Sequence, residues 1–61
     1  MVGHGEKLSR KQEQAIVALL QQSTIAEAAR VAGIGETTLW RWLQNDDFKV
    51  EYRSAKREAV A

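Results

Sequence analysis

Hydrophobic residues recur at a helical period from Leu8 to Ala59. In the first segment they lie on one face at 3.6-residue spacing, and the face consists of Leu8, Gln12, Ala15, Ile16 and Leu19. Ser9 and Gln12 open this segment as a capping box, in which both side chains satisfy backbone donors of the helix start. The pattern predicts a helix over about 9–22, preceded by a polar, glycine-containing flexible arm over 1–7.

A second, shorter segment has an inward stripe that is almost entirely alanine. Thr24 and Glu27 form another capping box, and the stripe then follows at i, i+3, i+4 and i+7: Ile25, Ala28, Ala29 and Ala32. Small side chains allow another backbone to approach closely. The pattern predicts a helix over about 25–32 that ends at Gly33, where a cap needs positive φ, followed by Ile34 as an apolar plug.

The third and fourth segments differ in what they expose. The third predicts a helix over about 36–44, with Leu39, Trp42 and Leu43 inward and the opposite face formed by Glu36, Thr37, Trp40, Arg41 and Gln44. The fourth predicts a helix over about 47–60, with Asp46 as its cap and a narrow stripe of Phe48, Tyr52, Ala55 and Ala59. No segment alternates as a strand would.

A short helix, a three-residue glycine turn and a second amphipathic helix are typical of the helix-turn-helix motif. Ala29 and Gly33 occupy positions where a crossing helix and a left-handed turn require small residues. We therefore expect an all-α domain over 8–61, in which a three-helix helix-turn-helix bundle carries a fourth, extended C-terminal helix.

Composition narrows the functional classes. The chain has 61 residues, no cysteine and a formal net charge of +1, which suits one small domain without disulfides or cysteine-bound zinc. Its longest apolar run, residues 15–20, is far shorter than the roughly 20 residues that cross a membrane. His4, the single histidine, has no partner to form a metal or acid–base site. We expect a cytoplasmic binding domain that is not an enzyme and takes no cofactor, metal or small-molecule substrate.

Residues 24–43 resemble the homeodomain-like helix-turn-helix of bacterial mobile elements. Within them, residues 33–43 (Gly-Ile-Gly-Glu-Thr-Thr-Leu-Trp-Arg-Trp-Leu) are similar to the DNA-binding end of site-specific invertases and resolvases. The longer pattern, which continues to Phe48, resembles phage terminase small subunits and transposase-associated proteins. The resemblance implies a compact helical bundle whose third helix enters the major groove.

The same resemblance implies that Thr37 and Arg41 reach base edges and that Thr38 and Trp40 lie near phosphates. Arginine is the commonest specific reader of guanine, and glutamine can read adenine, which adds Gln44 to the base-reading candidates. Trp40 has an alternative role as a core residue that shields the fourth helix. Glu36 stabilises the dipole of the third helix but repels phosphate.

Basic residues gather on one side of the fourth helix, at Lys49, Arg53, Lys56 and Arg57. We expect Lys49 and Arg53 to contact phosphates, although an ordinary solvated face has the same pattern. By resemblance to the invertase arm, Arg10 is a further phosphate candidate.

The predicted function is double-stranded DNA binding, as a transcriptional regulator or as the DNA-recognition part of a phage or transposon protein. One copy offers about one half-site of contacts, so a second copy that pairs through the C-terminal helix is an expected partner. The alternative is a small protein-interaction or assembly module in which Trp40 anchors a protein partner. Substitution of Arg41 by alanine separates the two.

Overall fold

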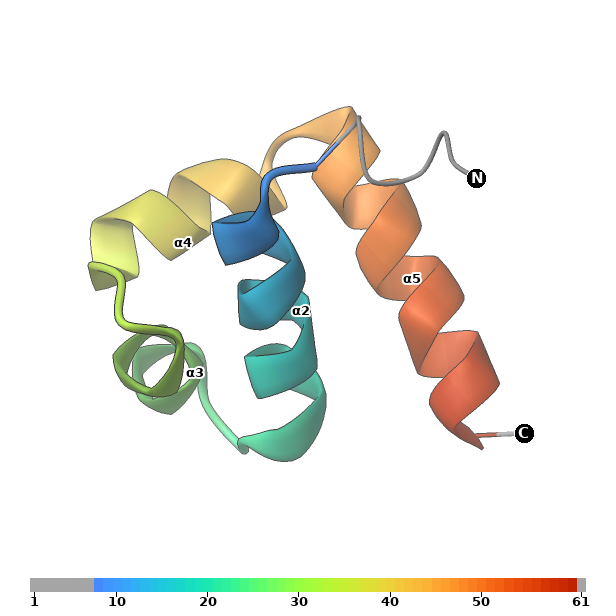
Figure 1. Cartoon of the computed structure of the whole chain (residues 1–61), viewed down its shortest axis with the longest axis horizontal. Coiled ribbons are helices and arrows are strands. Elements are labelled where there is room, and N and C mark those ends of the chain that lie inside the picture. The colour runs from blue at the N-terminus through green and yellow to red at the C-terminus, as the bar shows by residue number, and fades with distance from the viewer. Residues whose placement is uncertain (1–7, 61) are drawn as a thin grey trace.

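The computed structural model describes residues 8–60, and it describes the side chains of residues 8–58. Within this range the chain forms four helices and no strand: α2 (Arg10–Gln21), α3 (Ile25–Ala32), α4 (Glu36–Leu43) and α5 (Asp46–Val60). Helix α2 packs against α3 and α5, and α4 packs against the same two helices (Figure 1). The predicted all-α class is confirmed, whereas the arm predicted over 1–7 lies outside the described residues.

Helix α2 begins at the predicted capping box. The Gln12 amide donates to Ser9 Oγ at 3.2 Å, and the Ser9 amide donates to Gln12 Oε1 at 2.9 Å. Ser9 is the cap rather than a helical residue, so the helix begins one residue later than the predicted range and ends one residue earlier, at Gln21. Its inward face buries Ala15, Ile16 and Ala18, of which Ala18 was not among the predicted core residues.

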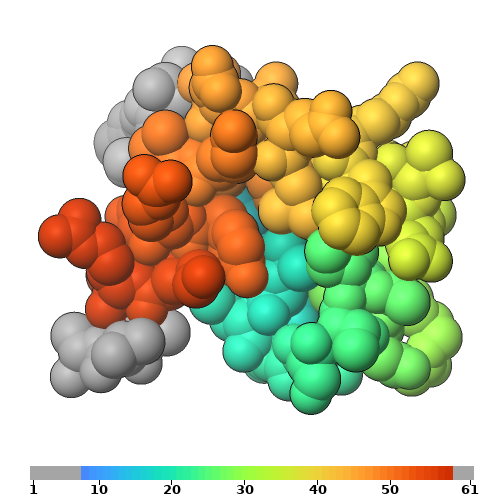
Figure 2. Space-filling model, turned by 180° about the vertical axis from the view of Figure 1, so that it is seen from behind, coloured from blue at the N-terminus to red at the C-terminus, as the bar shows by residue number. Residues whose placement is uncertain are grey.

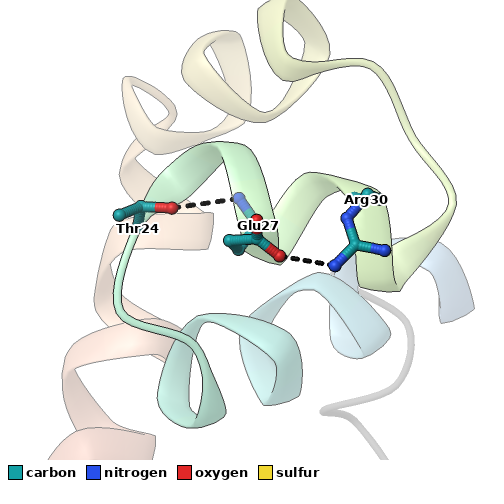
Figure 3. Close-up of polar contacts among 3 residues, drawn as sticks. All are labelled: Thr24, Glu27 and Arg30. Carbon is teal, nitrogen blue, oxygen red and sulfur yellow. Dashed lines mark hydrogen bonds and ion pairs between the residues drawn. The ribbon is translucent and has the colours of Figure 1, made fainter.

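Helix α3 has the predicted bounds, but its capping box forms only in part. The Glu27 amide donates to Thr24 Oγ1 at 3.1 Å. The Glu27 carboxylate does not return to the Thr24 backbone; it instead pairs with the Arg30 guanidinium at 2.6 Å (Figure 3). This bond and the carboxylate charge raise the pKa of Arg30. The expectation of a complete box was wrong because an arginine one turn later competes for the carboxylate.

The turn between α3 and α4 is held by backbone geometry and by one side chain from α2. Gly33 has φ 77°, its amide donates to Arg30 O at 3.1 Å, and the Ile34 amide donates to Ala29 O at 3.0 Å. These bonds form a Schellman motif, which requires the left-handed conformation that glycine adopts readily. Lys11 Nζ donates to Ala32 O at 3.0 Å, so the last turn of α3 is also tied to the start of α2.

Leu39 of α4 and Phe48 of α5 are the largest fully buried side chains of the described core. The Phe48 ring lies 5.9 Å from the Trp42 ring, centroid to centroid, which joins the two helices across their short connection. Helix α5 begins at Asp46 rather than near residue 47, because Asn45 is its cap: Asn45 Oδ1 accepts from the Phe48 amide at 3.1 Å. The prediction that Asp46 caps this helix was therefore wrong. The start of the helix is fixed by the residue three positions before the buried Phe48.

Candidate nucleic-acid interface

The outward face of α4 gathers the predicted base-reading residues. Thr37 and Arg41 are exposed one turn apart on this helix. The helix ends at Leu43, one residue before the predicted end, but Gln44 keeps right-handed helical angles (φ −94°, ψ −5°) and is exposed. Its side chain therefore continues the arc that Thr37 and Arg41 begin. The structure brings all three together on one exposed surface.

Trp40 lies on the same helix and is 49% exposed. Trp40 is therefore one of the exposed large hydrophobic residues and not a core residue, so the alternative of a core residue that shields α5 is wrong. The core positions of α4 are instead occupied by Leu39, which is buried, and by Trp42 and Leu43, which pack against the core. Thr38 is partly buried at the edge of the helix. The exposed Trp40 and the partly buried Thr38 thus border the polar arc.

The N-terminus of α4 has no side-chain cap. Gly35 occupies the cap position with extended backbone angles (φ −73°, ψ 150°) and makes no side-chain hydrogen bond. Glu36 follows in the first turn and is exposed. Its carboxylate is favourable for the helix dipole and places one negative charge at this end of an otherwise neutral and basic face.

Helix α5 contributes a cluster of cations beside the end of α4. Lys49, Arg53 and Lys56 line a hollow of about 270 Å³ together with Leu43 and Tyr52. Lys56 Nζ lies 5.1 Å from the centre of the Tyr52 ring, a cation–π arrangement. Figure 2 shows α2 in a hollow between α5 and α3. The residues that line the cationic hollow come from α4 and α5. The two predicted phosphate candidates of α5, Lys49 and Arg53, therefore lie side by side on one concave surface.

Arg10, the remaining phosphate candidate, is exposed as the first residue of α2. It does not line the hollow beside α4 and α5. Within residues 8–58 the one ion pair joins Arg30 to Glu27. Arg10 and Arg41 therefore carry charges that no carboxylate of the described side chains neutralises.

Two lysines have contacts that the sequence prediction did not assign. Lys56 was placed in the basic cluster of the fourth helix but not among the phosphate candidates, and it lines the hollow with Lys49 and Arg53. The amine of Lys11 is bound to the carbonyl end of α3. No local pattern identifies such a contact, since it joins residues far apart in the sequence.

Neither a candidate metal site nor a candidate membrane span is present in the described part of the chain. No group of three or more His, Cys, Asp or Glu side chains there is placed to hold a metal ion. None of the described helices combines the length and the apolar character that a membrane crossing requires.

Comparison with known proteins identifies the family of the domain. No curated protein and no solved structure matches the chain. Residues 7–46 match the family model described as the helix-turn-helix domain of transposase family ISL3. The matched segment contains α2, α3 and α4 in full, including the glycine turn and the outward face of α4. The chain belongs to this family of helix-turn-helix domains, and it is a DNA-binding domain of mobile-element type.

Proposed function

We propose that this domain recognises double-stranded DNA by placing α4 in the major groove, as the DNA-recognition part of a transposase. The single observation that carries the proposal is the outward face of α4, where Thr37, Arg41 and Gln44 are exposed together. In the helix-turn-helix motif the second helix is the one that enters the groove, and α4 follows the glycine turn.

The dimensions and chemistry of α4 suit this role. An α-helix with side chains is about 10–12 Å across, and the major groove is about 12 Å wide. Arg41 would donate two hydrogen bonds to guanine O6 and N7, and Gln44 would pair with adenine N6 and N7. Thr37 would donate or accept at a base edge or contact a thymine methyl group. These roles assign sequence preference to α4.

Phosphate contacts would come from the edges of α4 and from neighbouring helices. Trp40 and Thr38 would lie along the sugar-phosphate edges of the groove, while Lys49, Arg53 and Arg10 would neutralise phosphates. Such contacts fix the register of the helix in the groove without reading sequence. Their positive charges are consistent with this role, since within residues 8–58 none of the three forms an ion pair.

A second copy of the chain would supply the other half-site. The second copy would pair through α5. Phe48, Tyr52 and Ala55 already pack in or against the core of one copy, so other residues of α5 would form the contact. Among the described side chains of α5, Val50 is the exposed large hydrophobic residue, at 62%. Sedimentation equilibrium with and without DNA tests this arrangement, and Val50→Glu should abolish a dimer that forms through this face.

Fluorescence anisotropy of a labelled mixed-sequence duplex, titrated with the domain at about 50 and 200 mM salt, tests DNA binding itself. The proposal predicts affinity that falls steeply as salt rises, because bound cations release counterions from the duplex. Selection from a random duplex pool should then yield a preferred site, and Arg41→Ala should weaken that preference. If the domain leaves the duplex unbound at the lower salt concentration, the proposal fails.

A further inference from the structure

We propose that the hollow between the end of α4 and α5 seats the sugar-phosphate backbone of the same duplex that α4 enters. Lys49, Arg53 and Lys56 would hold the phosphate charge there. This inference rests on the proposed function, and it adds to it a defined cationic seat, with Lys56 as a member and Arg57 as an outsider.

The hollow is concave and lined by one sign of charge. Its wall is formed by Leu43, Lys49, Tyr52, Arg53 and Lys56, and it encloses about 270 Å³. Among residues 8–58, no carboxylate lines it. A concave surface with one sign of charge and apolar walls concentrates its field on an ion of opposite sign. The ligand that fits is therefore an anion whose neighbouring atoms contact Leu43 and Tyr52, such as a phosphate of the DNA backbone with its attached deoxyribose.

The cations of the hollow lie on one side of α5 by helical spacing. Arg53 and Lys56 follow Lys49 by four and seven residues, which places all three on one face. Like charges at i, i+4 repel each other, and within residues 8–58 these side chains form no ion pair that relieves the repulsion. A bound polyanion would remove this repulsion. Glu51 and Glu58 belong to the opposite side of the helix and do not line the hollow.

The hollow lies where a groove wall is expected. Leu43, the last residue of α4, contributes to its wall, so the hollow lies at the C-terminal end of the helix that carries Trp40. A helix of about 10–12 Å that fills a groove of about 12 Å brings a backbone strand against each of its flanks. The strand beside Trp40 would continue towards the hollow. The aromatic face of Tyr52, with Lys56 Nζ 5.1 Å from its centre, would form the floor under the sugar.

Most of helix α5 follows the matched segment. The family match ends at residue 46, where α5 begins, and all three cations of the seat follow it. The matched segment therefore supplies the reading helix, while the residues after it supply the seat for the backbone.

Adjacent residues provide a matched test. Lys56→Gln and Arg57→Gln each remove one positive charge from the same turn of α5, but only Lys56 lines the hollow. The dependence of log K on log salt is measured for both variants and for wild type, on the selected duplex and on a scrambled duplex, between about 50 and 200 mM salt. Lys56→Arg, which keeps the charge, is the rescue variant.

The proposal predicts that Lys56→Gln lowers the magnitude of the salt slope by about 0.9 on both duplexes and leaves their affinity ratio unchanged. Arg57→Gln and Lys56→Arg should retain the wild-type slope. The variant Lys49→Gln with Arg53→Gln and Lys56→Gln should lose about 0.9 for each charge. Equal slopes for Lys56→Gln and Arg57→Gln would overturn the seat while leaving binding by α4 intact. If wild type binds neither duplex, the proposed function and the seat fail together.

Discussion

Helices α4 and α5 both present exposed polar faces, yet the two faces have different chemistry. The face of α4 mixes hydroxyl, amide, aromatic and guanidinium groups, at Thr37, Trp40, Arg41 and Gln44. The hollow of α5 presents cations alone, beside an aromatic ring. Mixed donors and acceptors distinguish one base pair from another, whereas cations recognise the phosphates that every sequence shares. This difference supports the proposal that α4 determines which DNA sequence is bound and that α5 binds the phosphates shared by every duplex.

The two helices are also anchored differently. Helix α5 begins at a side-chain cap, with Asn45 Oδ1 accepting from the Phe48 amide. Helix α4 begins at Glu36, and its cap residue Gly35 makes no such bond. Its position therefore depends on its neighbours: the buried Leu39, the glycine turn and the Lys11 bond to Ala32. Substitutions near α4 should therefore alter the contacts of Thr37, Arg41 and Gln44 with bases before they alter the phosphate contacts of the α5 hollow.

The largest expected effect removes both faces together. Phe48→Ala deletes a fully buried ring that joins α5 to Trp42, and we expect it to lower the free energy of unfolding by about 3–5 kcal/mol. A domain of this size has little stability to lose, so the variant should be largely unfolded by circular dichroism. Val50→Ala on the same helix is the control, since an exposed side chain should matter by less than about 0.5 kcal/mol.

The next effect is specific to α4. Arg41→Ala should weaken binding to the selected duplex by about 1–3 kcal/mol and relax the preference at one base position. Binding to a scrambled duplex should change less. The measurement is anisotropy across duplexes that vary at single positions. Arg30→Ala on α3 removes an equal charge that is already paired with Glu27, and an equal loss of preference in that variant would contradict the assignment.

A smaller effect tests how α4 is positioned. Lys11→Met keeps the aliphatic stem but removes the bond from Nζ to Ala32 O, which should lower stability by about 0.5–1.5 kcal/mol. Arg10→Met changes the neighbouring residue by the same charge, and it should alter stability by less than about 0.5 kcal/mol. Urea denaturation of both variants gives the comparison. Equal stabilities would show that Lys11 does not support the turn.

The last two substitutions change stability in opposite directions at two glycines, and the one at Gly35 has the smallest expected effect. Gly35→Ser should raise stability by about 0.5 kcal/mol, because its backbone is already extended and an added Cβ meets only Thr38 Oγ1 at 3.8 Å. Gly33→Ser should lower stability by about 1 kcal/mol or more, because φ is 77° and Lys11 Nζ lies 3.3 Å from the new Cβ. Thermal unfolding measures both, and a loss of stability in Gly35→Ser would refute the account of the open cap.

Local patterns predicted the helices well, since spacing and caps are encoded within a few residues. Residues close together in the sequence predicted three features of the structure: the alanine stripe of α3, the capping box of Ser9 and the positive φ of Gly33. The cap of α5 was misplaced because Asn45 and Asp46 are equally good caps by residue type. In the structure Asn45 is the cap, since its Oδ1 accepts from the Phe48 amide, and residue type alone does not distinguish it from Asp46.

The site was predictable only as far as one helix extends. Spacing within α4 placed Thr37, Arg41 and Gln44 on one face, but it left the role of Trp40 open until its exposure was known. The hollow depends on the angle between α4 and α5, because Leu43 comes from one helix and Lys56 from the other. Lys11 reaches Ala32 across the bundle. Tertiary arrangement fixes these contacts, and periodicity along one segment does not contain them.

Amide chemical shifts of the labelled domain, recorded during titration with a selected duplex, test whether α4 and the hollow of α5 contact DNA. Binding through these two surfaces predicts large changes over residues 36–44 of α4 and its cap and over residues 49–56 of α5. It also predicts little change around Val17 and Val31, two exposed residues that line a different hollow, between α2 and α3. Changes that concentrate around Val17 and Val31, with α4 unaffected, would contradict the account.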